Sequence, residues 1–434
     1  MTKKSDAPAI RFKGFSDAWE QREVGDLLIE RSQQAPMSDE YPLMAFIANE
    51  GVAPKGERYD RSALVTDTVN KLYKKTEKGD FIYSSNNLET GSIGLNKYGK
   101  ACISPVYSIF EPTGIADSDF LGRRLVRKDF INAMVKWRQG VIYGQWRIHE
   151  SDFLKIEISV PSVEEQRKIG AYLDQLDNLI TLHQRKFEKL TNVKKSMLEK
   201  MFPQNGSSYP EIRFKGFTDP WEQRKFDEVF DCTVPNNTLS RAELSYDEGT
   251  VLNVHYGDVL IKYGSVLDVQ KDDIPRIPHR CREDFNGALL QDGDVIIADT
   301  AEDETTGKAC EIGNLQGSAI VSGLHTMVCR PRNRMALGYL GYYLNSNAYH
   351  HQLLPLMQGI KVLSLSRSNI QKTSVSYPIA VKEQQLIAYY FSQLDNLITL
   401  HQRQTIVYAV IRSIRKVILA ERQYFAPPMV RKSP

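Results

Sequence analysis

The side chains best suited to chemistry are basic, amide and aromatic residues that alternate in one short run. Residues 137–147 read WRQGVIYGQWR and place Arg138, Gln145 and Arg147 among aromatic side chains. Arginine can form two hydrogen bonds with guanine and glutamine two with adenine, while lysine and tyrosine suit phosphates. The run therefore predicts contact with nucleic acid. The alternative is a solvated charged face beside tryptophans of a hydrophobic core.

Further basic residues extend this predicted surface in both halves of the chain. In the first half they are Lys55, Arg58, Tyr59, Arg61, Lys71, Lys74 and Lys75. In the second half they are Lys262, Tyr263, Arg276, Arg282, Lys361 and Arg367. Acidic residues gather between Asp292 and Glu304, and we expect them to face away from a phosphate backbone. A merely solvated face is again the alternative for the basic clusters.

Other kinds of site find little support in the sequence. Residues 94–101 have the glycines and lysine of a phosphate-binding loop but end in Ala101, so the hydroxyl that ligates magnesium is missing. The eight histidines lack zinc-ligand spacing, and the five cysteines include no CxxC pair. No nucleophile is grouped with a base. We expect reduced thiols and neither a catalytic nor a metal site.

Two stretches that occur twice reveal the organisation of the chain. Residues 10–22 return with two changes as 212–224, and residues 175–185 return unchanged as 393–403. The first pair is 202 residues apart and the second 218, so the second copy has gained 16 residues between them. The chain is therefore a tandem duplication.

A long amphipathic helix is predicted near the end of each copy. Ser162 and Glu165 have the spacing of a capping box, and the helix they start should reach Met201. From Ile169, apolar residues recur at alternating steps of four and three, the pattern of a coiled-coil seam. The second copy predicts a similar helix over 383–422. The predicted packing residues are Leu173, Leu176, Ile180, Phe187, Phe391, Leu394 and Ile398.

Two polar residues, His183 and Lys194, interrupt this seam, where polar side chains usually set register or partner. Beyond His401 the pattern predicts that the apolar stripe shifts to Val407, followed by the isoleucines at 411, 414 and 418. The first helix would reach about 55 Å, which is the length of a spacer. Two such helices in one chain can pack on each other.

The inserts, 23–163 and 225–381, each predict a mixed α/β globule. Short β-branched and aromatic runs at 79–83, 294–297 and 318–321 predict strands. Both inserts share a sparse set of residues in one order, so we predict that they are duplicates with different surfaces. The shared residues are Gly79-Asp80 with Gly293-Asp294, 99–102 with 307–310, Gln139-Gly140 with Gln358-Gly359, and Glu165-Gln166 with Glu383-Gln384.

Length and composition set broad limits. A chain of 434 residues can form two or three domains, and the repeat predicts two. Its 56 Lys and Arg against 53 Asp and Glu give a net charge of +3, so any basic surface must be local. No apolar run is long enough for a membrane span, and the first ten residues lack the apolar core of a signal peptide. We expect a soluble, cytoplasmic protein without a membrane partner.

The repeated segments resemble the specificity subunit of Type I restriction-modification systems. The resemblance rests on RFKGFSDAWEQR at 11–22 and its copy, on the proline and Glu-Gln pair that open each helix, and on LDNLI at 176–180 and 394–398. It covers nearly the whole chain. It implies an α+β architecture in which two mixed α/β target recognition domains are separated by two long antiparallel coiled-coil helices, as a pseudo-two-fold tandem repeat.

This resemblance also implies function and partners. Each target recognition domain would read one half of a bipartite, asymmetric site in double-stranded DNA. Two methyltransferase subunits and restriction/translocase subunits would bind, and they would carry S-adenosylmethionine, ATP and magnesium. A coiled-coil scaffold that joins proteins without reading DNA is the alternative that the helices alone would permit. The implied segments are a conserved N-terminal segment 1–22, target recognition domain 23–163, central helix 164–203, repeated segment 204–224, target recognition domain 225–381, distal helix 382–425 and tail 426–434.

Overall fold

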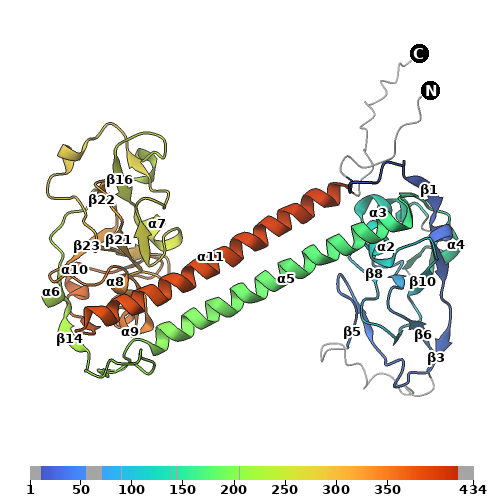
Figure 1. Cartoon of the computed structure of the whole chain (residues 1–434), viewed down its shortest axis with the longest axis horizontal. Helices are drawn as coiled ribbons and strands as arrows, with labels where there is room; N and C mark the ends of the chain where they lie inside the picture. The colour runs from blue at the N-terminus through green and yellow to red at the C-terminus, as the bar shows by residue number, and fades with distance from the viewer. Residues whose placement is uncertain are drawn as a thin grey trace, which may run out of the picture. The chain divides into compact units, whose positions relative to one another are not determined.

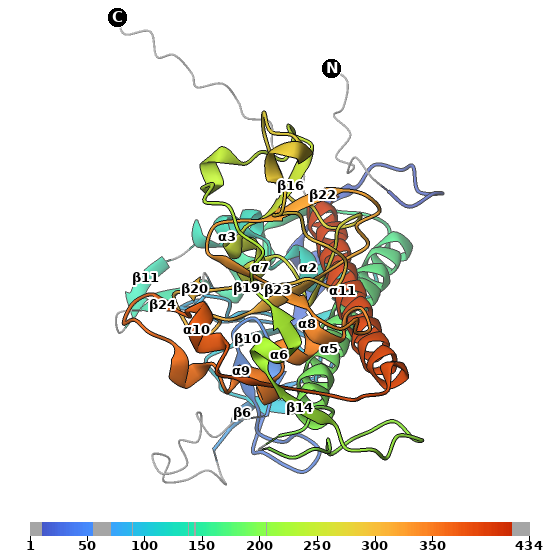
Figure 2. The same ribbon diagram turned by 90° about the vertical axis from the view of Figure 1, so that its left-hand side faces the viewer.

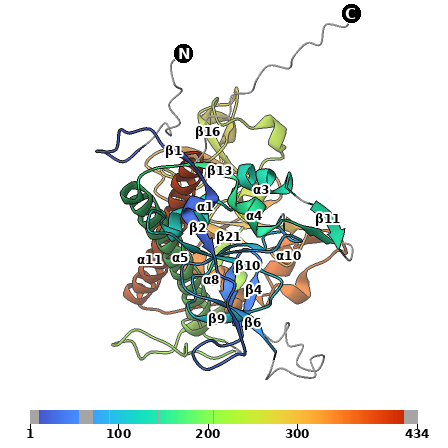
Figure 3. The same ribbon diagram turned by 90° about the vertical axis from the view of Figure 1, so that its right-hand side faces the viewer.

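The computed structural model describes residues 11–54, 71–88, 90–137, 139–142, 145–204 and 206–418; for 139–142, 145–147 and 412–418 it describes the backbone alone. The chain divides into two compact units, residues 1–182 with 404–434, and residues 183–403. Figure 1 labels the elements, Figure 2 faces the second unit and Figure 3 faces the first.

The first unit is a mixed α/β domain of short strands and helices. One sheet has the strand order β2-β10-β7-β8 and another β3-β6-β9, and buried aromatic side chains such as Phe81, Tyr83 and Phe110 fill the core. The strands are β1 (Glu20–Glu23), β2 (Leu28–Glu30), β3 (Gln34–Ala35), β4 (Ala45–Ile47), β5 (Gly51–Ala53), β6 (Tyr73–Thr76), β7 (Phe81–Tyr83), β8 (Ile93–Leu95), β9 (Ala101–Ile103), β10 (Ser108–Pro112), β11 (Gln139–Ile142), β12 (Gln145–Arg147) and β13 (Glu157–Val160). The helices are α1 (Val24–Leu27), α2 (Ser118–Arg124), α3 (Lys128–Val135) and α4 (Glu150–Leu154).

The second unit contains a domain of the same class. Its largest sheet has the order β15-β23-β19-β21-β17, and a smaller one β18-β16-β22. The strands are β14 (Glu222–Lys225), β15 (Phe230–Asp231), β16 (Val251–Val254), β17 (Val266–Asp268), β18 (Arg276–Ile277), β19 (Val295–Ala298), β20 (Thr300–Ala301), β21 (Ala309–Gly313), β22 (Ala319–Ser322), β23 (Thr326–Pro331), β24 (Leu363–Ser364) and β25 (Ser374–Tyr377). The helices are α6 (Phe226–Val229), α7 (Tyr256–Ile261), α8 (Tyr339–Leu344), α9 (Asn347–His350) and α10 (Arg367–Ile370), with short 3-10 turns at Arg241–Glu243, Arg282–Phe285 and Leu354–Leu356.

Strand pairing confirms that the two inserts are duplicates. β1 pairs antiparallel with β13, as β14 does with β25. β7 lies between β10 and β8, as β19 lies between β23 and β21. The predicted strands at 79–83, 294–297 and 318–321 are β7, β19 and β22. Each Gly-Asp pair directly precedes an interior strand of its sheet, β7 or β19.

The proposed match of the two Gly-Lys-Ala-Cys runs is wrong. β7 pairs with β8 and β19 pairs with β21 in the same register relative to the two Gly-Asp pairs. Gly307, two residues before β21, therefore corresponds to Gly91, two residues before β8, and both have positive φ (89° and 95°). Residues 99–102 lead instead into β9, which pairs with β6. The four-letter match is a coincidence that only the strand pairing exposes.

Two long helices are present, α5 (Val163–Lys200) and α11 (Val381–Ile418). α5 begins just before the predicted Glu165 and ends one residue before the predicted Met201, whereas the predicted end of the second helix at 422 lies outside the described residues. All seven predicted packing residues are buried or half-buried. Leu173, Leu176, Ile180, Phe391 and Leu394 are buried, and Phe187 and Ile398 are half-buried.

The predicted shift of the apolar stripe beyond His401 is wrong at Val407. Val407 is 54% exposed, whereas Tyr408 and Ile411 pack against the core of the first unit. The α11 stripe therefore continues from His401 to Tyr408 by the same steps of four and three. The side chains of the isoleucines at 414 and 418 lie outside the described residues.

The start of each long helix is tied to its own domain by a repeated arginine. Ser162 Oγ accepts a hydrogen bond from the Glu165 backbone N–H (3.4 Å), as a capping box requires. The Glu165 carboxylate does not complete the box, because it accepts from Arg11 Nε (2.9 Å). Arg213 makes the equivalent pair with Glu383, with Nε to Oε1 at 2.7 Å. The reciprocal half of the predicted box is therefore replaced by a buried ion pair.

The repeated glutamines have the same kind of role. Gln166 Nε2 donates to the Pro161 carbonyl and Gln384 Nε2 to the Pro378 carbonyl, both at 2.9 Å. Each glutamine also accepts a backbone N–H from its domain, from Asp117 in the first copy at 3.0 Å. The proline and Glu-Gln pair thus recur because they fix where a domain ends and its helix begins.

In the second unit, the two long helices meet through the polar seam residues. His183 Nδ1 lies 2.9 Å from His401 Nδ1, and Lys194 forms an ion pair with Asp395. His183 and His401 are the same residue of the repeated segment, 218 positions apart. A residue that contacts its own equivalent is what an internal two-fold axis produces.

This histidine contact predicts a pH dependence. Burial and then the charges of His401 and Lys186 lower the pKa of His183 from 6.5. Because the folded pKa lies below the unfolded one, the contribution to stability is complete above pH 6.5 and is lost as the pH falls through the folded pKa. We expect the double change His183→Leu, His401→Leu to raise the thermal unfolding midpoint more at pH 5.5 than at pH 8, by circular dichroism. An equal change at both pH values would contradict this assignment.

Candidate nucleic-acid interface

The predicted contact run 137–147 and the segment that carries the predicted Lys361 and Arg367 lie at the same place in the two domains. In the first domain, β11 and β12 form a hairpin in which Gln139 pairs with Arg147. In the second, Gln358 pairs with Ser364. Each hairpin leads directly into a short helix, α4 or α10. The Gln-Gly pairs that the sequence aligned therefore mark one hairpin present in both copies.

Several of the predicted contact residues lie beyond what the structure describes. They are Lys55, Arg58, Tyr59, Arg61 and Arg138, together with the side chains of Gln145 and Arg147, whose backbone is described in β12.

The three lysines around β6 differ in their availability. Lys71 is exposed, with Nζ 5.8 Å from the centre of the Tyr73 ring. Lys74 is half-buried and donates to the Tyr107 carbonyl (2.9 Å), and Lys75 Nζ lies 4.2 Å from the centre of the Tyr41 ring. Lys71 is thus the best placed of the three for a phosphate, because it is exposed whereas Lys74 and Lys75 are half-buried.

Tyr263 was predicted to contact DNA, and this prediction is wrong. Its side chain is 3% exposed and belongs to the core formed with Val259 and Leu267. Burial raises the pKa of Tyr263 well above its usual range. The neighbouring Lys262 pairs with Asp273 Oδ2 (2.9 Å), so a phosphate would have to displace a carboxylate. A sequence shows that a tyrosine follows a lysine but not that it points inward.

The four remaining predicted residues of the second domain lie in two kinds of place. Arg276 and Arg282 donate to backbone carbonyls, of Tyr246 at 2.9 Å and of Gly317 at 3.2 Å. Lys361 lies in the 358–364 hairpin and Arg367 is the first residue of α10, and both are exposed. Lys361 and Arg367 therefore lie six residues apart on one segment, whereas Arg276 in β18 and Arg282 in a 3-10 turn hold contacts elsewhere in the domain.

Three of the acidic residues, Glu302, Asp303 and Glu304, lie near the stem of this hairpin, and their orientation away from a phosphate backbone stays a prediction. Residues 302–304 are exposed in the loop between β20 and β21, and β20 pairs with β24 of the hairpin. Thr306 Oγ1, in the same loop, donates to the Leu363 carbonyl at 3.4 Å. Negative charge therefore borders the hairpin stem and disfavours close approach of a phosphate there.

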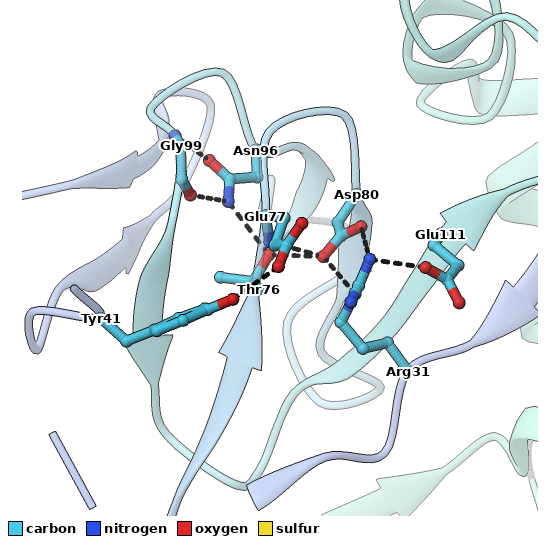
Figure 4. Close-up of polar contacts among 8 residues, drawn as sticks. All are labelled: Arg31, Tyr41, Thr76, Glu77, Asp80, Asn96, Gly99 and Glu111. Carbon is cyan, nitrogen blue, oxygen red and sulfur yellow. Dashed lines mark hydrogen bonds and ion pairs between the residues drawn. The ribbon is translucent and has the colours of Figure 1, made fainter. Parts of the chain in front are cut away.

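A buried aspartate directly before an interior strand pairs with an arginine in each domain. In the first domain, Asp80 Oδ2 lies 2.9 Å from Arg31 Nε, and Arg31 Nη2 lies 2.6 Å from Glu111 Oε2 (Figure 4). Asp80 also accepts from Thr76 Oγ1 (3.0 Å) and the Glu77 N–H (2.7 Å). Burial raises the pKa of Asp80, while these hydrogen bonds and Arg31 lower it.

The second domain pairs the equivalent aspartate with an arginine from a different strand. Asp294 is 1% exposed and accepts from Arg330 Nε (2.8 Å) and Nη2 (2.7 Å). Arg330 precedes the proline that ends β23, just as Glu111 precedes the proline that ends β10. The Gly-Asp pairs identified these carboxylates in the sequence. Their arginine partners could not be found by comparing the two copies, because Arg31 and Arg330 occupy non-equivalent positions.

The part of the chain that the structure describes contains no group of three or more His, Cys, Asp or Glu side chains placed to hold a metal ion. None of its helices is long and apolar enough to cross a membrane.

The family model of the Type I restriction modification DNA specificity domain matches this chain twice, at residues 17–192 and 218–407. Each match lies on one copy of the internal repeat. The chain is also 22% identical over 405 residues to the Type I restriction enzyme MjaVIII specificity subunit of Methanocaldococcus jannaschii, which covers 89% of this chain and 88% of that protein.

Two solved structures align with most of this chain at low sequence identity. The S subunit of a Type-I restriction-modification system from M. genitalium aligns with a TM-score of 0.50 and 13% identity, over 95% of this chain and 98% of that one. The HsdS subunit from Thermoanaerobacter tengcongensis aligns with a TM-score of 0.43 and 18% identity, over 96% and 98% of the two chains.

Proposed function

This chain belongs to the Type I restriction modification DNA specificity family, and from that membership we propose that each of its two domains reads one half of a bipartite, asymmetric DNA site. The DNA specificity role follows from the family. The division into half-sites is supported by one observation: the same hairpin recurs at the same place in both domains but has different residues. One frame with two different surfaces suits two different half-sites.

We propose that α5 and α11 form an antiparallel coiled coil that sets the distance between the half-sites. Each has 38 residues, which corresponds to about 57 Å. Half-sites on duplex DNA are commonly one turn, about 34–36 Å, apart. The contact between His183 and His401 supports this arrangement, because equivalent residues meet at an internal two-fold axis.

The partners follow from the same proposal. Two methyltransferase subunits would bind the duplicated helices, one to each copy, and restriction/translocase subunits would join them. S-adenosylmethionine, ATP and magnesium would be bound by those subunits, and this chain would contribute specificity without catalysis. The repeat supports two docking positions because residues 175–185 and 393–403 are identical.

The deciding experiment is methylation-sensitive sequencing of DNA modified by the chain together with its cognate methyltransferase subunit. We expect a motif of two short specified sequences separated by unspecified bases. Exchange of residues 23–163 for the corresponding insert of a relative should change one of these sequences and leave the other. Modification without any sequence preference would refute the proposal.

Base-reading and phosphate-binding residues should respond differently to substitution. We expect Arg147→Ala to relax one position in one half-site, because the loss of a bidentate contact costs about 1–3 kcal/mol for the preferred base. Lys71→Ala should weaken binding to all sequences alike and reduce the slope of log K against log salt by about 1. Filter binding at several salt concentrations measures both. Uniform loss in the Arg147 variant would reject its assignment.

A further inference from the structure

The tip of the hairpin in the second domain carries a fully exposed apolar side chain. Ile360 is 100% exposed, and Val362, two residues later, is 50% exposed. Isolated exposed apolar residues are ordinary on protein surfaces. This one differs because it lies at the tip of the segment that also carries the exposed Lys361, on a domain whose family reads DNA.

The stem beneath this tip is firmly held. Gln358 and Ser364 exchange two backbone hydrogen bonds, of 3.0 and 2.8 Å. The Leu365 N–H donates to the Asp299 carbonyl (2.8 Å), and the Leu365 side chain is buried in the core. The short loop from Gly359 to Leu363 is thus closed by a fixed stem, which reduces the ordering entropy that binding would cost.

Gly359 makes the tight turn at the tip possible. Its φ is 128°, and a Cβ built on it would lie 1.9 Å from the Val362 carbonyl oxygen. No other residue fits this position without moving the backbone. Gly359 therefore allows the turn in which Ile360 is exposed. The first domain has the same Gln-Gly pair at Gln139-Gly140.

The first hairpin differs at this point. Val141 follows its Gln-Gly pair, but the backbone of Val141 pairs with Trp146 in the β11–β12 ladder, so Val141 lies in the stem. The exposed aliphatic residue at the tip is thus observed in the second domain.

The charges around the tip indicate which part of a duplex it could meet. Lys361 is exposed beside Ile360, whereas the exposed acidic residues 302–304 border the stem. The carboxylates disfavour a phosphate at the stem, and an aliphatic side chain gains nothing from one. Its favourable environment on DNA is between or against the bases, where proteins insert Ile, Leu, Met, Phe or Pro.

We propose that Ile360 is a wedge that inserts at a base step of the half-site read by the second domain and partly unstacks it. This inference rests on the proposed function. Specificity would then come in part from the ease with which that step opens, in addition to hydrogen bonds with base edges.

The test uses the full chain with its cognate methyltransferase subunits and duplexes carrying the recognised site. 2-Aminopurine replaces one base at a time, outside the base that is methylated. We expect fluorescence to rise at one step with the unchanged protein and not with Ile360→Ala. Affinity of that variant for the site should fall about tenfold to hundredfold, which corresponds to one unburied isoleucine side chain, while binding to random duplex stays within about twofold. Ile360→Leu should retain the fluorescence rise.

Ile261→Ala is the matched control, because Ile261 is 88% exposed at the end of α7 in the same domain. It should behave as the unchanged protein. Normal fluorescence and affinity with Ile360→Ala would overturn the wedge while the unchanged complex still selects its site. Release of a methyltransferase subunit by Ile360→Ala in sedimentation velocity would also overturn it and make the tip a protein contact. An unchanged complex without site selection would refute the proposed function itself.

Discussion

Replacement of Arg330 by methionine is expected to lower the free energy of unfolding of the second domain by about 3 kcal/mol. The Asp294 carboxylate is 1% exposed and would lose both of its bonds to the guanidinium, of 2.8 and 2.7 Å. It would keep only the Gln291 N–H at 2.8 Å, which leaves a buried charge without a counter-ion. Hydrogen exchange of peptides from β19 and β23 in the full chain would report the loss locally.

The first domain indicates a second substitution that should restore the stability lost in this variant. There the aspartate pairs with Arg31. Arg31 lies three residues after Leu28, and Leu28 pairs with Pro112, the proline that ends β10. Thr233 lies three residues after Phe230, and Phe230 pairs with Pro331, the proline that ends β23. The double variant Arg330→Glu, Thr233→Arg would therefore recreate the first domain's arrangement in the second. We expect it to recover at least half of the lost stability.

The control is Arg334→Met, an exposed arginine just beyond the same strand, which should change stability by less than about 0.5 kcal/mol. If Arg330→Met costs no more than this control, the buried pair does not stabilise the domain. If the double variant recovers no stability, an arginine at position 233 does not provide the counter-ion that Arg31 provides in the first domain.

The sequence predicted those parts of the fold in which side-chain type and spacing decide the outcome. The heptad stripe fixed the packed face of α5, because burial of a helix follows its 3.6-residue period. The Gly-Asp pairs marked equivalent turns, because a positive-φ glycine and a buried carboxylate are hard to replace. Strand pairing depends on residues far apart in the chain, and this is why the Gly-Lys-Ala-Cys runs misled the alignment of the inserts.

The candidate site was less predictable than the fold for a physical reason. A basic or aromatic residue is a DNA contact only if it is exposed and not already paired. Tyr263 fails the first condition and Lys74, which donates to the Tyr107 carbonyl, is compromised by the second. Conversely, Ile360 has no charge and drew no attention in the sequence. Only the hairpin geometry makes it prominent.

Removal of one heptad from each long helix is expected to shorten the unspecified gap of the recognition site without altering either specified half. Residues 180–186 and 398–404, centred on His183 and His401, are suitable. Asp177, which pairs with Arg123, and Asp395, which accepts from the Tyr342 hydroxyl, lie outside them. The seam phase is retained because seven residues complete two turns. The loss of about 10 Å corresponds to about three base pairs.

The same deletion should also weaken binding, for a reason that tests the spacer directly. Seven residues turn a helix by only about 20° from register, whereas three base pairs turn the duplex by about 100°. The two domains would meet the shorter site out of phase, so affinity should fall more than tenfold even at the best gap length. Deletion from α5 alone breaks the match between the helices and should abolish site-specific methylation. Sequencing of modified DNA across a library of gap lengths measures each case. An unchanged gap, or altered half-sites, would mean that the helices do not set the spacing, because a spacer that loses length must move the half-sites together while the reading surfaces stay as they were.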